Sequence, residues 1–403
     1  MKRKMWFLLL GLLTLVLVLA ACGGGPAGGP EAAGDGETEA SDGGGESTDD
    51  TAVSEAPAEG DGELQLADEL SVYNWADYID QDMIAAYEEE FGVDIIYDEY
   101  ASNEDLLAKL QAGATRYDVI FPSDYMVAIM IDLGLLHKID TNELPNFGNL
   151  APEFLDAPFD PGNQYCVPYY WGTTGIGYRA GYPFFEENPP DSWAYVFEPE
   201  LLENYADDGI NVLNDPRELT AAALMYLGYD PNTLNVDELN AARDLMLNAK
   251  PYWKTFNSSD YDTALLIPDE VVLSHAWSGG VARAYWETYD EETEDGNWYY
   301  AIPKEGAVKW LDNICITADT ERYETAMHFM NYLLEPEVAG TITNYVYYSS
   351  PNTAAEEFID EELLNDPSIY PPPEIREKLV WLTEVDEATL PLYDQLWTAV
   401  KSQ

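Results

Sequence analysis

The sequence predicts an α/β protein with two doubly wound lobes, a hinge between them and a ligand cleft at that hinge. Strand-like apolar runs alternate with amphipathic helical segments over residues 70–121 and again over 210–276. The segment from residue 69 to the end exceeds the roughly 250–300 residues that one hydrophobic core supports, so two lobes are expected. Two further strand-like runs, 165–178 and 310–317, are suited to cross between the lobes.

The first strand and helix are expected near the start of this segment. Residues 70–74 are strand-like, Asp80 is placed to cap a helix, Gly92 is placed to end it, and residues 93–97 return as a second strand. One face of the helix carries the apolar residues Ile84, Tyr87 and Phe91. The spacing therefore predicts a helix that packs on a sheet.

The same pattern continues with a second helix and a third strand. Asn103 is expected to cap the helix and Gly113 to end it, and residues 117–121 are the next strand. The inward positions of this helix are Leu106, Leu107 and Leu110. A β-α-β-α-β order predicts right-handed crossovers over a parallel sheet.

A second unit repeats this order further along the chain. Residues 210–213 and 271–276 are strand-like, and a helix is expected to start after the first of them. Asp215 and Glu218 have the spacing of an N-cap residue and its N3 acid, with Pro216 at N1. On sequence alone, this capping role is favoured over a role in a pocket.

Aromatic and acidic residues cluster where three strand-like runs stop, at residues 73–78, 122–125 and 309–313. Ligands of doubly wound sheets bind at the carboxyl ends of the strands. Rings and carboxylates gathered there predict a pocket for an elongated organic cation. Trp75 and Trp310 each have an aspartate two residues on, which places ring and acid on one face of an extended segment.

The N-terminal segment has the features of an export signal. Residues 2–4 are basic and precede an apolar run over residues 6–21, which is short for a transmembrane helix. The run ends in Leu19-Ala20-Ala21-Cys22, which looks like a bacterial lipobox. We therefore predict a signal peptide over residues 1–22 that is cut before Cys22, whose thiol is then lipidated. The alternative is a retained membrane anchor.

Residues 23–68 are rich in glycine, alanine, serine, threonine, proline and acid, with almost no large apolar side chain. Such a segment cannot offset the entropy lost on ordering, so a disordered acidic tether is expected. A Gly-rich coil of this length spans about 35–40 Å. The tether would hold the folded body clear of a membrane surface.

The formal net charge is −58. This argues against nucleic acid and anionic lipid headgroups as partners and favours cations. A saline habitat also explains such an imbalance, and the sequence does not separate the two causes.

The cysteines and histidines of the sequence do not have the spacing of a metal-binding motif. Cys166 and Cys315 lie in apolar strand-like runs. Either they form a disulfide or they are two buried free thiols, and the sequence leaves both alternatives open. The histidines, His137, His275 and His328, are scattered and have no metal-ligand spacing. We expect neither a metal site nor a cofactor, and the acidic run 290–296 is interpreted as a solvated turn because its glycine does not fit a calcium loop.

Taken in order, several short motifs resemble those of the spermidine/putrescine-binding proteins of ABC importers. The resemblance covers nearly the whole segment after the tether. The motifs are Tyr73-Asn74-Trp75, Ser102-Asn103-Glu104, Pro122-Ser123-Asp124-Tyr125, Pro168-Tyr169-Tyr170-Trp171-Gly172, Phe256-Asn257-Ser258, Trp277, Trp310-Leu311-Asp312 and Ser350-Pro351-Asn352. It implies a type II periplasmic-binding-protein fold with discontinuous lobes, residues 69–175 plus 312–358 and residues 176–311 plus 359–403.

The resemblance also implies a ligand site when the family's residues are carried over by motif. Ser123 would be a polar neighbour of the ligand. The ring walls would be Trp75, Tyr78, Tyr125, Trp277, Trp310 and Tyr348. The acids facing ammonium groups would be Asp77, Asp215, Glu218 and Asp312. The sequence departs from the family at Ala76, often Thr or Ser, and at Thr398, where a Gln is expected.

The function implied is that of the extracytoplasmic polyamine-binding component of an ABC importer, monomeric and not an enzyme. It would be lipid-anchored in the periplasm or on the outer face of the cytoplasmic membrane and would deliver spermidine or putrescine to a permease. The alternatives are a same-fold receptor for a quaternary amine, a sugar or an iron chelate, and an extracellular hydrolase with paired carboxylates. A sugar site would use basic groups, and Arg179 and Arg217 are the ones near the predicted cleft.

Overall fold

A single mixed sheet joins the strands of the described chain. The computed structural model describes residues 65–113, 117–383, 385 and 389–402, all within one compact unit. The sheet has the strand order β2-β1-β3-β9-β4-β7-β5-β6, with β10 paired to β9 and β8 paired to β4. The predicted signal peptide, the lipidation site Cys22 and most of the predicted tether lie outside the described residues.

The elements alternate along the chain much as the sequence predicts. The strands are β1 Glu69–Trp75, β2 Asp94–Tyr100, β3 Val119–Ile120, β4 Cys166–Arg179, β5 Ile210–Val212, β6 Thr255–Phe256, β7 Leu273–Trp277, β8 Trp298–Ala301, β9 Ala307–Ile316 and β10 Leu379–Trp381. The α-helices are α1 Gln81–Phe91, α2 Asn103–Ala112, α3 Asp124–Asp132, α4 Pro183–Glu187, α5 Ala194–Phe197, α6 Pro199–Leu202, α7 Pro216–Tyr226, α8 Val236–Ala249, α9 Ser278–Glu287, α10 Tyr323–Leu333, α11 Pro336–Val346, α12 Glu361–Leu364, α13 Pro373–Arg376 and α14 Leu390–Ser402. Shorter helical turns are η1 Thr141–Glu143, η2 Pro145–Asn149, η3 Pro152–Phe154, η4 Ala206–Asp208, η5 Lys250–Tyr252, η7 Thr353–Phe358 and the π-helical η6 Asp262–Leu266.

The first β-α-β-α-β unit is confirmed. β1 pairs in parallel with both β2 and β3. The Asp80 side chain caps α1 by accepting from the Asp82 amide, and Gly92 ends the helix in the left-handed region, where glycine is not strained. The predicted cap of α2 is wrong by one residue, because Ser102 accepts from the Asp105 amide and Asn103 is the first helical residue.

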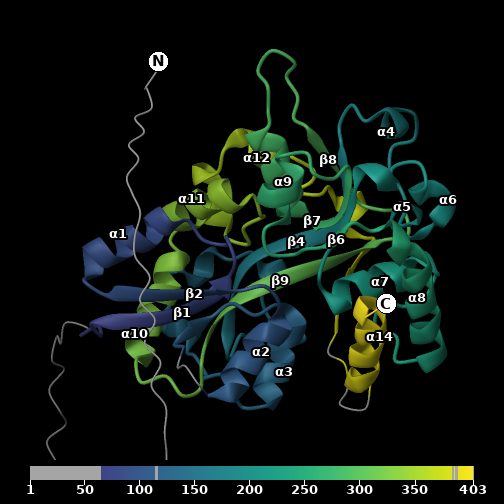
Figure 1. Ribbon diagram of the computed structural model, residues 1–403. Coiled ribbons are helices and arrows are strands. Elements are labelled where there is room, and N and C mark those ends of the chain that lie inside the picture. The colour runs from purple at the N-terminus through teal and green to yellow at the C-terminus, as the bar shows by residue number, and fades with distance from the viewer. Residues whose placement is uncertain (1–64, 114–116, 384, 386–388, 403) are drawn as a thin grey trace, which may run out of the picture. The chain divides into compact units, whose positions relative to one another are not determined.

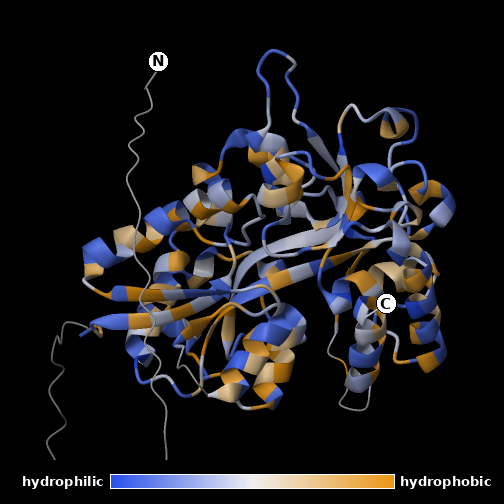
Figure 2. Cartoon of the chain, in the orientation of Figure 1, coloured by the Kyte–Doolittle hydropathy of each residue, from blue (hydrophilic) through white to orange (hydrophobic). Residues whose placement is uncertain are grey.

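Side chains of β1 alternate between two hydrophobic cores. Leu70 and Val72 pack in one core with Tyr87 of α1, and Tyr73 packs in the other with Leu106 of α2. Helices therefore cover both faces of these strands, α1 on one side and α2 with α3 on the other (Figure 1). Apolar residues follow the strands and the inner helix faces, while outer helix faces are hydrophilic (Figure 2).

The second unit is also confirmed. β5 pairs in parallel with β7 and with β6. The side chain of Asp215 caps α7 by accepting from the Arg217 and Glu218 amides, at 2.9 and 3.0 Å, and Pro216 occupies the first turn. The strand, the helix start and the returning strand thus follow the predicted order.

The two long strand-like runs become β4 and β9, which pair antiparallel in the middle of the sheet. The parallel sheet predicted for each unit is therefore flanked by antiparallel pairs, and the whole sheet is mixed. Cys166 and Cys315 are direct partners in this pairing and form a disulfide. The question that the sequence left open is answered in favour of the bridge. The two-lobe boundaries stay a prediction.

We expect the double variant Cys166→Ala/Cys315→Ala to lose about 2–4 kcal/mol of unfolding free energy, because the bridge closes a long loop in the unfolded chain. The bridged residues are 149 positions apart in the sequence. Urea titration of the oxidised protein and of the variant measures the difference. Under a reducing agent the two proteins should unfold at similar urea concentrations. Equal stability under oxidising conditions would contradict a stabilising bridge.

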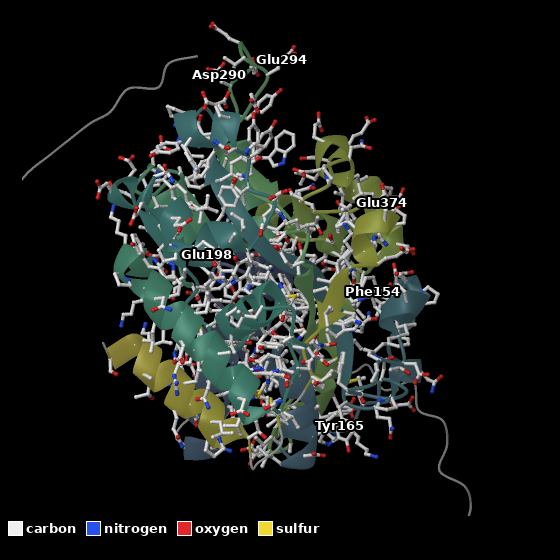
Figure 3. All side chains as sticks on the ribbon, turned by 90° about the vertical axis from the view of Figure 1, so that its right-hand side faces the viewer. Phe154, Tyr165, Glu198, Asp290, Glu294 and Glu374 are labelled. Carbon is white, nitrogen blue, oxygen red and sulfur yellow. A yellow bond between two sulfur atoms is a disulfide. The ribbon has the colours of Figure 1, made fainter. Side chains whose placement is uncertain are left out.

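The acidic run 290–296 forms an exposed turn, closed by a bridge between Asp290 and Asp295. Its tip, with Asp290 and Glu294, projects from the body (Figure 3). The part of the chain that the structure describes contains no group of three or more histidine, cysteine or acidic side chains that could hold a metal ion.

Candidate functional site

A pocket lies where the strand ends of both units meet. It encloses a cavity of about 80 Å³, room for several water-sized groups since roughly 10–15 Å³ of such volume holds one water. All eleven residues predicted to bind a ligand line it, namely Trp75, Asp77, Tyr78, Ser123, Tyr125, Asp215, Glu218, Trp277, Trp310, Asp312 and Tyr348. They come from the ends of β1 and β7, from β9, from the starts of α3 and α7, and from the segment after α11.

Aromatic rings form the walls of the pocket. Trp75 and Trp277 meet edge to face with their centroids 6.0 Å apart, and Tyr348 meets Trp310 at 5.2 Å and Tyr78 at 5.4 Å. The Trp75 ring is fixed because its Nε1 donates to the Phe121 carbonyl at 2.8 Å. Such walls supply apolar contact for methylene groups and negative ring faces for cations.

Gly279 allows one of these rings to close on the pocket. A Cβ at this position would lie 2.4 Å from the Tyr348 ring. Glycine is therefore required at this position in the first turn of α9, because the Tyr348 ring packs against its backbone. A larger side chain would push Tyr348 away.

Asp312 is held by a chain of side-chain hydrogen bonds. The Ser123 hydroxyl donates to Asp312 Oδ1 at 2.6 Å, and the Asn103 side chain donates to Ser123 Oγ at 3.0 Å and accepts from the Ser123 amide at 3.1 Å. Asn103 also donates to the Tyr125 hydroxyl at 3.1 Å. The residue that the sequence assigned to a helix cap thus orients two residues of the pocket.

Burial makes Asp312 hard to ionise. Its side chain is 5% exposed, and loss of solvation raises the pKa of the carboxyl to about 7, although the bond from Ser123 opposes the shift. Asp124, which sequence reasoning missed, also lines the pocket and is equally enclosed. Burial raises the pKa of Asp124 to about 8, and the amides of Tyr125 and Leu311, 2.6 and 3.3 Å away, oppose that shift.

Asp215 and Glu218 both line the pocket, but only Asp215 also caps a helix. Asp215 caps α7, so the favoured capping interpretation is confirmed, and it still lines the pocket. The Glu218 side chain is buried, and its Oε2 has no hydrogen-bond partner among the described residues. Burial raises the pKa of both carboxyls, and for Glu218 the neighbouring Asp215 adds to the shift. An unpartnered buried oxygen facing a pocket is suited to a hydrogen-bond donor from a ligand.

Four acids of the pocket have no basic partner within ion-pair distance in the part of the chain that the structure describes. We call them the unpaired carboxyls: Asp124, Asp215, Glu218 and Asp312. The Arg217 guanidinium lies over the rings of Tyr125 and Tyr393. Arg217 does not line the pocket. Its positive charge nevertheless opposes the pKa shifts of Asp215 and Glu218.

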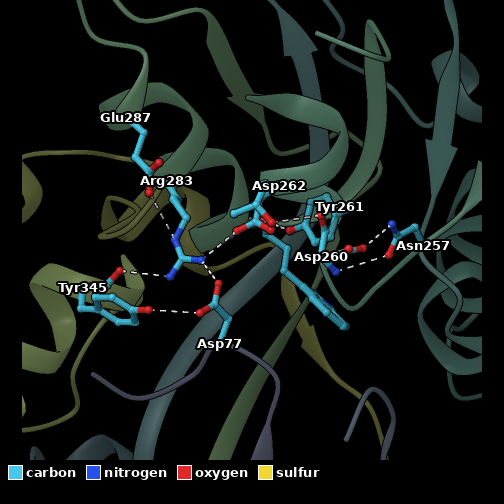
Figure 4. Close-up of polar contacts among 10 residues, drawn as sticks. Asp77, Asn257, Asp260, Tyr261, Asp262, Arg283, Glu287 and Tyr345 are labelled. Carbon is cyan, nitrogen blue, oxygen red and sulfur yellow. Dashed lines mark hydrogen bonds and ion pairs between the residues drawn. The ribbon is translucent and has the colours of Figure 1, made fainter. Parts of the chain in front are cut away.

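Asp77 has a different environment from the one expected. It takes a left-handed backbone conformation with φ 58°, so ring and acid are not on one extended face after Trp75. Its Oδ2 accepts from Arg283 at 2.5 Å and its Oδ1 accepts from the Tyr345 hydroxyl at 3.1 Å (Figure 4). Arg283 also pairs with Asp262 at 3.2 Å. We call Asp77, Asp262, Arg283 and Tyr345 the arginine cluster.

The expectation that Arg179 lies near the cleft is wrong. Arg179 pairs with Asp269 at 2.8 Å and donates to the Asn297 carbonyl, away from the pocket lining. Arg283, which the sequence did not single out, is the arginine that lines the pocket among the described residues.

Comparison with known proteins places the chain in a family. The family model described as bacterial extracellular solute-binding protein matches residues 82–371. The chain belongs to this family. It is 38% identical over 348 residues to the putrescine-binding periplasmic protein SpuD of Pseudomonas aeruginosa, covering 85% of this chain and 94% of that protein. It is 37% identical over 340 residues to the putrescine-binding periplasmic protein PotF of Escherichia coli, covering 83% of this chain and 91% of that one.

Solved structures agree with this assignment. A putative spermidine/putrescine ABC transporter from Listeria monocytogenes superposes with a TM-score of 0.76 and 32% identity, covering 83% of this chain and 99% of that one. The predicted periplasmic-binding-protein fold and the resemblance to polyamine-binding proteins are confirmed. Both relatives are named as putrescine-binding periplasmic proteins. No helix in the described ranges is both long and apolar enough for a membrane crossing.

Proposed function

We propose that this protein is the polyamine-binding component of an ABC importer, which captures spermidine or putrescine outside the cytoplasm and delivers it to a permease. The observation that carries the proposal is the set of unpaired carboxyls buried between aromatic walls. Names of relatives that bind putrescine support the same ligand class. The proposed role is binding without catalysis.

The chemistry of a polyamine matches the two parts of the pocket. Its ammonium groups are cations with several N–H donors, which suit Asp312 Oδ atoms and the unpartnered Glu218 Oε2. Its methylenes suit the rings of Trp75, Trp277 and Trp310. Each buried methylene contributes about 0.8 kcal/mol and each ring over an ammonium about 0.5–2 kcal/mol, sufficient for micromolar binding near −8 kcal/mol after ordering costs.

Other solutes fit the pocket less well. A neutral sugar would leave the unpaired carboxyls without a counter-charge in a dry environment, which is costly. A quaternary amine carries the positive charge but has no N–H to donate to Glu218 Oε2. A primary amine satisfies both requirements.

We further propose that the mature protein is a monomer attached by lipid at Cys22, on the outer face of the cytoplasmic membrane or in the periplasm. The proposal rests on the lipobox-like Leu19-Ala20-Ala21-Cys22 sequence and on the composition of residues 23–68. Metabolic labelling with a fatty-acid analogue should mark the wild type. Labelling should be lost in Cys22→Ser, and equal labelling of both would contradict the anchor.

Titration calorimetry of the purified protein should show one equivalent of putrescine or spermidine bound, with a Kd of about 1 µM or below. Choline and a panel of sugars are the comparison ligands. Affinity should fall as salt rises, because opposite charges steer and hold the ligand. Saturable binding of choline or a sugar, without a response to any polyamine, would refute the proposed ligand.

A further inference from the structure

We propose that Arg283 is a specificity-determining residue that makes the pocket select linear diamines over longer triamines. The inference rests on the proposed polyamine function and adds the class of polyamine. Arg283 is a cation that belongs to the protein and lines the pocket beside its ion-pair partners Asp77 and Asp262. Without Arg283, a third ammonium of a triamine would find these two carboxylates free.

Arg283 is held from several sides. It lies on α9, and its side chain is 6% exposed. Its guanidinium pairs with Asp77 at 2.5 Å and Asp262 at 3.2 Å, and it donates to the Tyr345 carbonyl at 3.3 Å (Figure 4). It also lies over the Tyr345 ring at 5.3 Å. So many contacts in a buried position make displacement into solvent costly.

The arginine cluster leaves few acceptors for a ligand. Both carboxylate oxygens of Asp77 already accept hydrogen bonds, one from Arg283 and one from the Tyr345 hydroxyl. Asp262 Oδ2 accepts from Arg283 as well. An ammonium entering here would therefore compete with a resident guanidinium for the same oxygens, and the charge of the guanidinium cancels part of the attraction of the two carboxylates.

Tyr348 lies close to both sets of pocket acids, the arginine cluster and the unpaired carboxyls. Its ring contacts Trp310, and burial, then Asp262, raises the pKa of its hydroxyl, with Asp312 contributing further and Arg283 opposing. The unpaired carboxyls on the Asp312 side have no such basic partner within the described chain. A ligand with two ammonium groups can be satisfied there. An additional aminopropyl arm would extend its third ammonium toward Arg283.

The test is a pair of titrations, with putrescine and with spermidine, on the wild type and on variants. In the wild type we expect the Kd of spermidine to exceed that of putrescine by about tenfold or more, since the third ammonium would have to displace Arg283 from its carboxylates. In Arg283→Gln the ratio of the two Kd values should fall by about tenfold. Arg283→Lys retains the positive charge and should keep a ratio above one.

Arg179→Gln is the matched control, because Arg179 is also paired with an aspartate but lies outside the pocket lining. Its ratio should equal that of the wild type. If Arg283→Gln does not fold, Asp262→Asn replaces it as the test. That variant leaves the charge of Arg283 less neutralised, so the ratio should rise.

The outcomes separate this inference from the proposed function. Equal affinity of the wild type for putrescine and spermidine would overturn the inference and leave the polyamine function intact. An unchanged ratio in folded Arg283→Gln, or an unchanged or lower ratio in Asp262→Asn, would overturn it as well. Absence of binding to either polyamine would instead remove the proposed function on which the inference rests.

Discussion

Asp312→Asn is expected to weaken polyamine binding by about 2–5 kcal/mol, the range seen when one partner of a buried charge pair is removed. The substitution keeps the shape of the side chain and can still accept from Ser123, which lies 2.6 Å from Asp312 Oδ1. What it removes is the negative charge that would face an ammonium group. Titration calorimetry with putrescine measures the loss, and the thermal midpoint of the free protein measures folding.

The matched control is Asp319→Asn, at an exposed aspartate outside the pocket lining. Affinity should remain within about 0.5 kcal/mol of the wild type, the usual range for surface substitutions. If Asp312→Asn lowers the thermal midpoint while putrescine affinity is unchanged, Asp312 stabilises the fold and does not bind the ligand. The ammonium partner would then be Glu218 or Asp215.

Most of the aromatic and acidic side chains of the pocket could be predicted from the sequence, because local patterns place them. Trp75 and Trp277 end strands, and Asp215 starts a helix after a strand, so each lies at the edge of the sheet where ligands bind. The motif resemblance added residues such as Tyr348, which no strand or helix pattern would single out. Those residues do meet in one pocket.

The arginine cluster could not be predicted, because its pairs join distant parts of the chain. Asp77 and Arg283 are 206 positions apart, and the pairing depends on how α9 packs beside the end of β1. The weak signal in the sequence is an arginine in a helix whose neighbours are small or apolar, at Gly279, Gly280 and Ala282. A charged residue there must find a partner when the helix is buried.

Asn103 and Asp124 show a second limit of local reasoning. Ser102 and Asn103 are both good helix caps, and the choice between them was decided by tertiary contacts, since Asn103 bonds to Ser123. An aspartate in the first turn of a helix, such as Asp124, is ordinarily explained by the helix dipole. Its burial follows from β9, whose Leu311 amide is 187 positions away. The Cys166–Cys315 bridge likewise needed the pairing of β4 with β9.

The pKa values of the pocket acids predict that polyamine binding strengthens as pH rises from 6 to 8. Burial raises the pKa of Asp312 to about 7 and that of Asp124 to about 8, against an ordinary aspartate value of 3.8. Burial also raises the pKa of Asp215 and Glu218, while the nearby Arg217 opposes their shifts. At pH 6 the free protein therefore holds protons at Asp312 and Asp124.

The ligand keeps its charge over the same interval, because amine pKa values lie near 10, as in lysine. An ammonium group binds the ionised carboxylate, so protons must leave when the ligand enters. If Asp312 alone must ionise, the Kd at pH 6 should be about tenfold weaker than at pH 8, and more if Asp124 ionises too. The apparent enthalpy should also differ between buffers of different ionisation heat.

Stability of the free protein should follow the opposite trend. The folded pKa of Asp312 lies above its unfolded value, so between about pH 4 and 7 the folded state holds more protons than the unfolded state. The contribution of Asp312 to the unfolding free energy is therefore greatest at low pH and falls as pH rises through 7. In Asp312→Asn this decline should be reduced and the pH dependence of putrescine affinity should flatten. Equal affinity at pH 6 and 8 in the wild type, with buffer-independent heat, would show that the carboxyls are already ionised before the ligand enters.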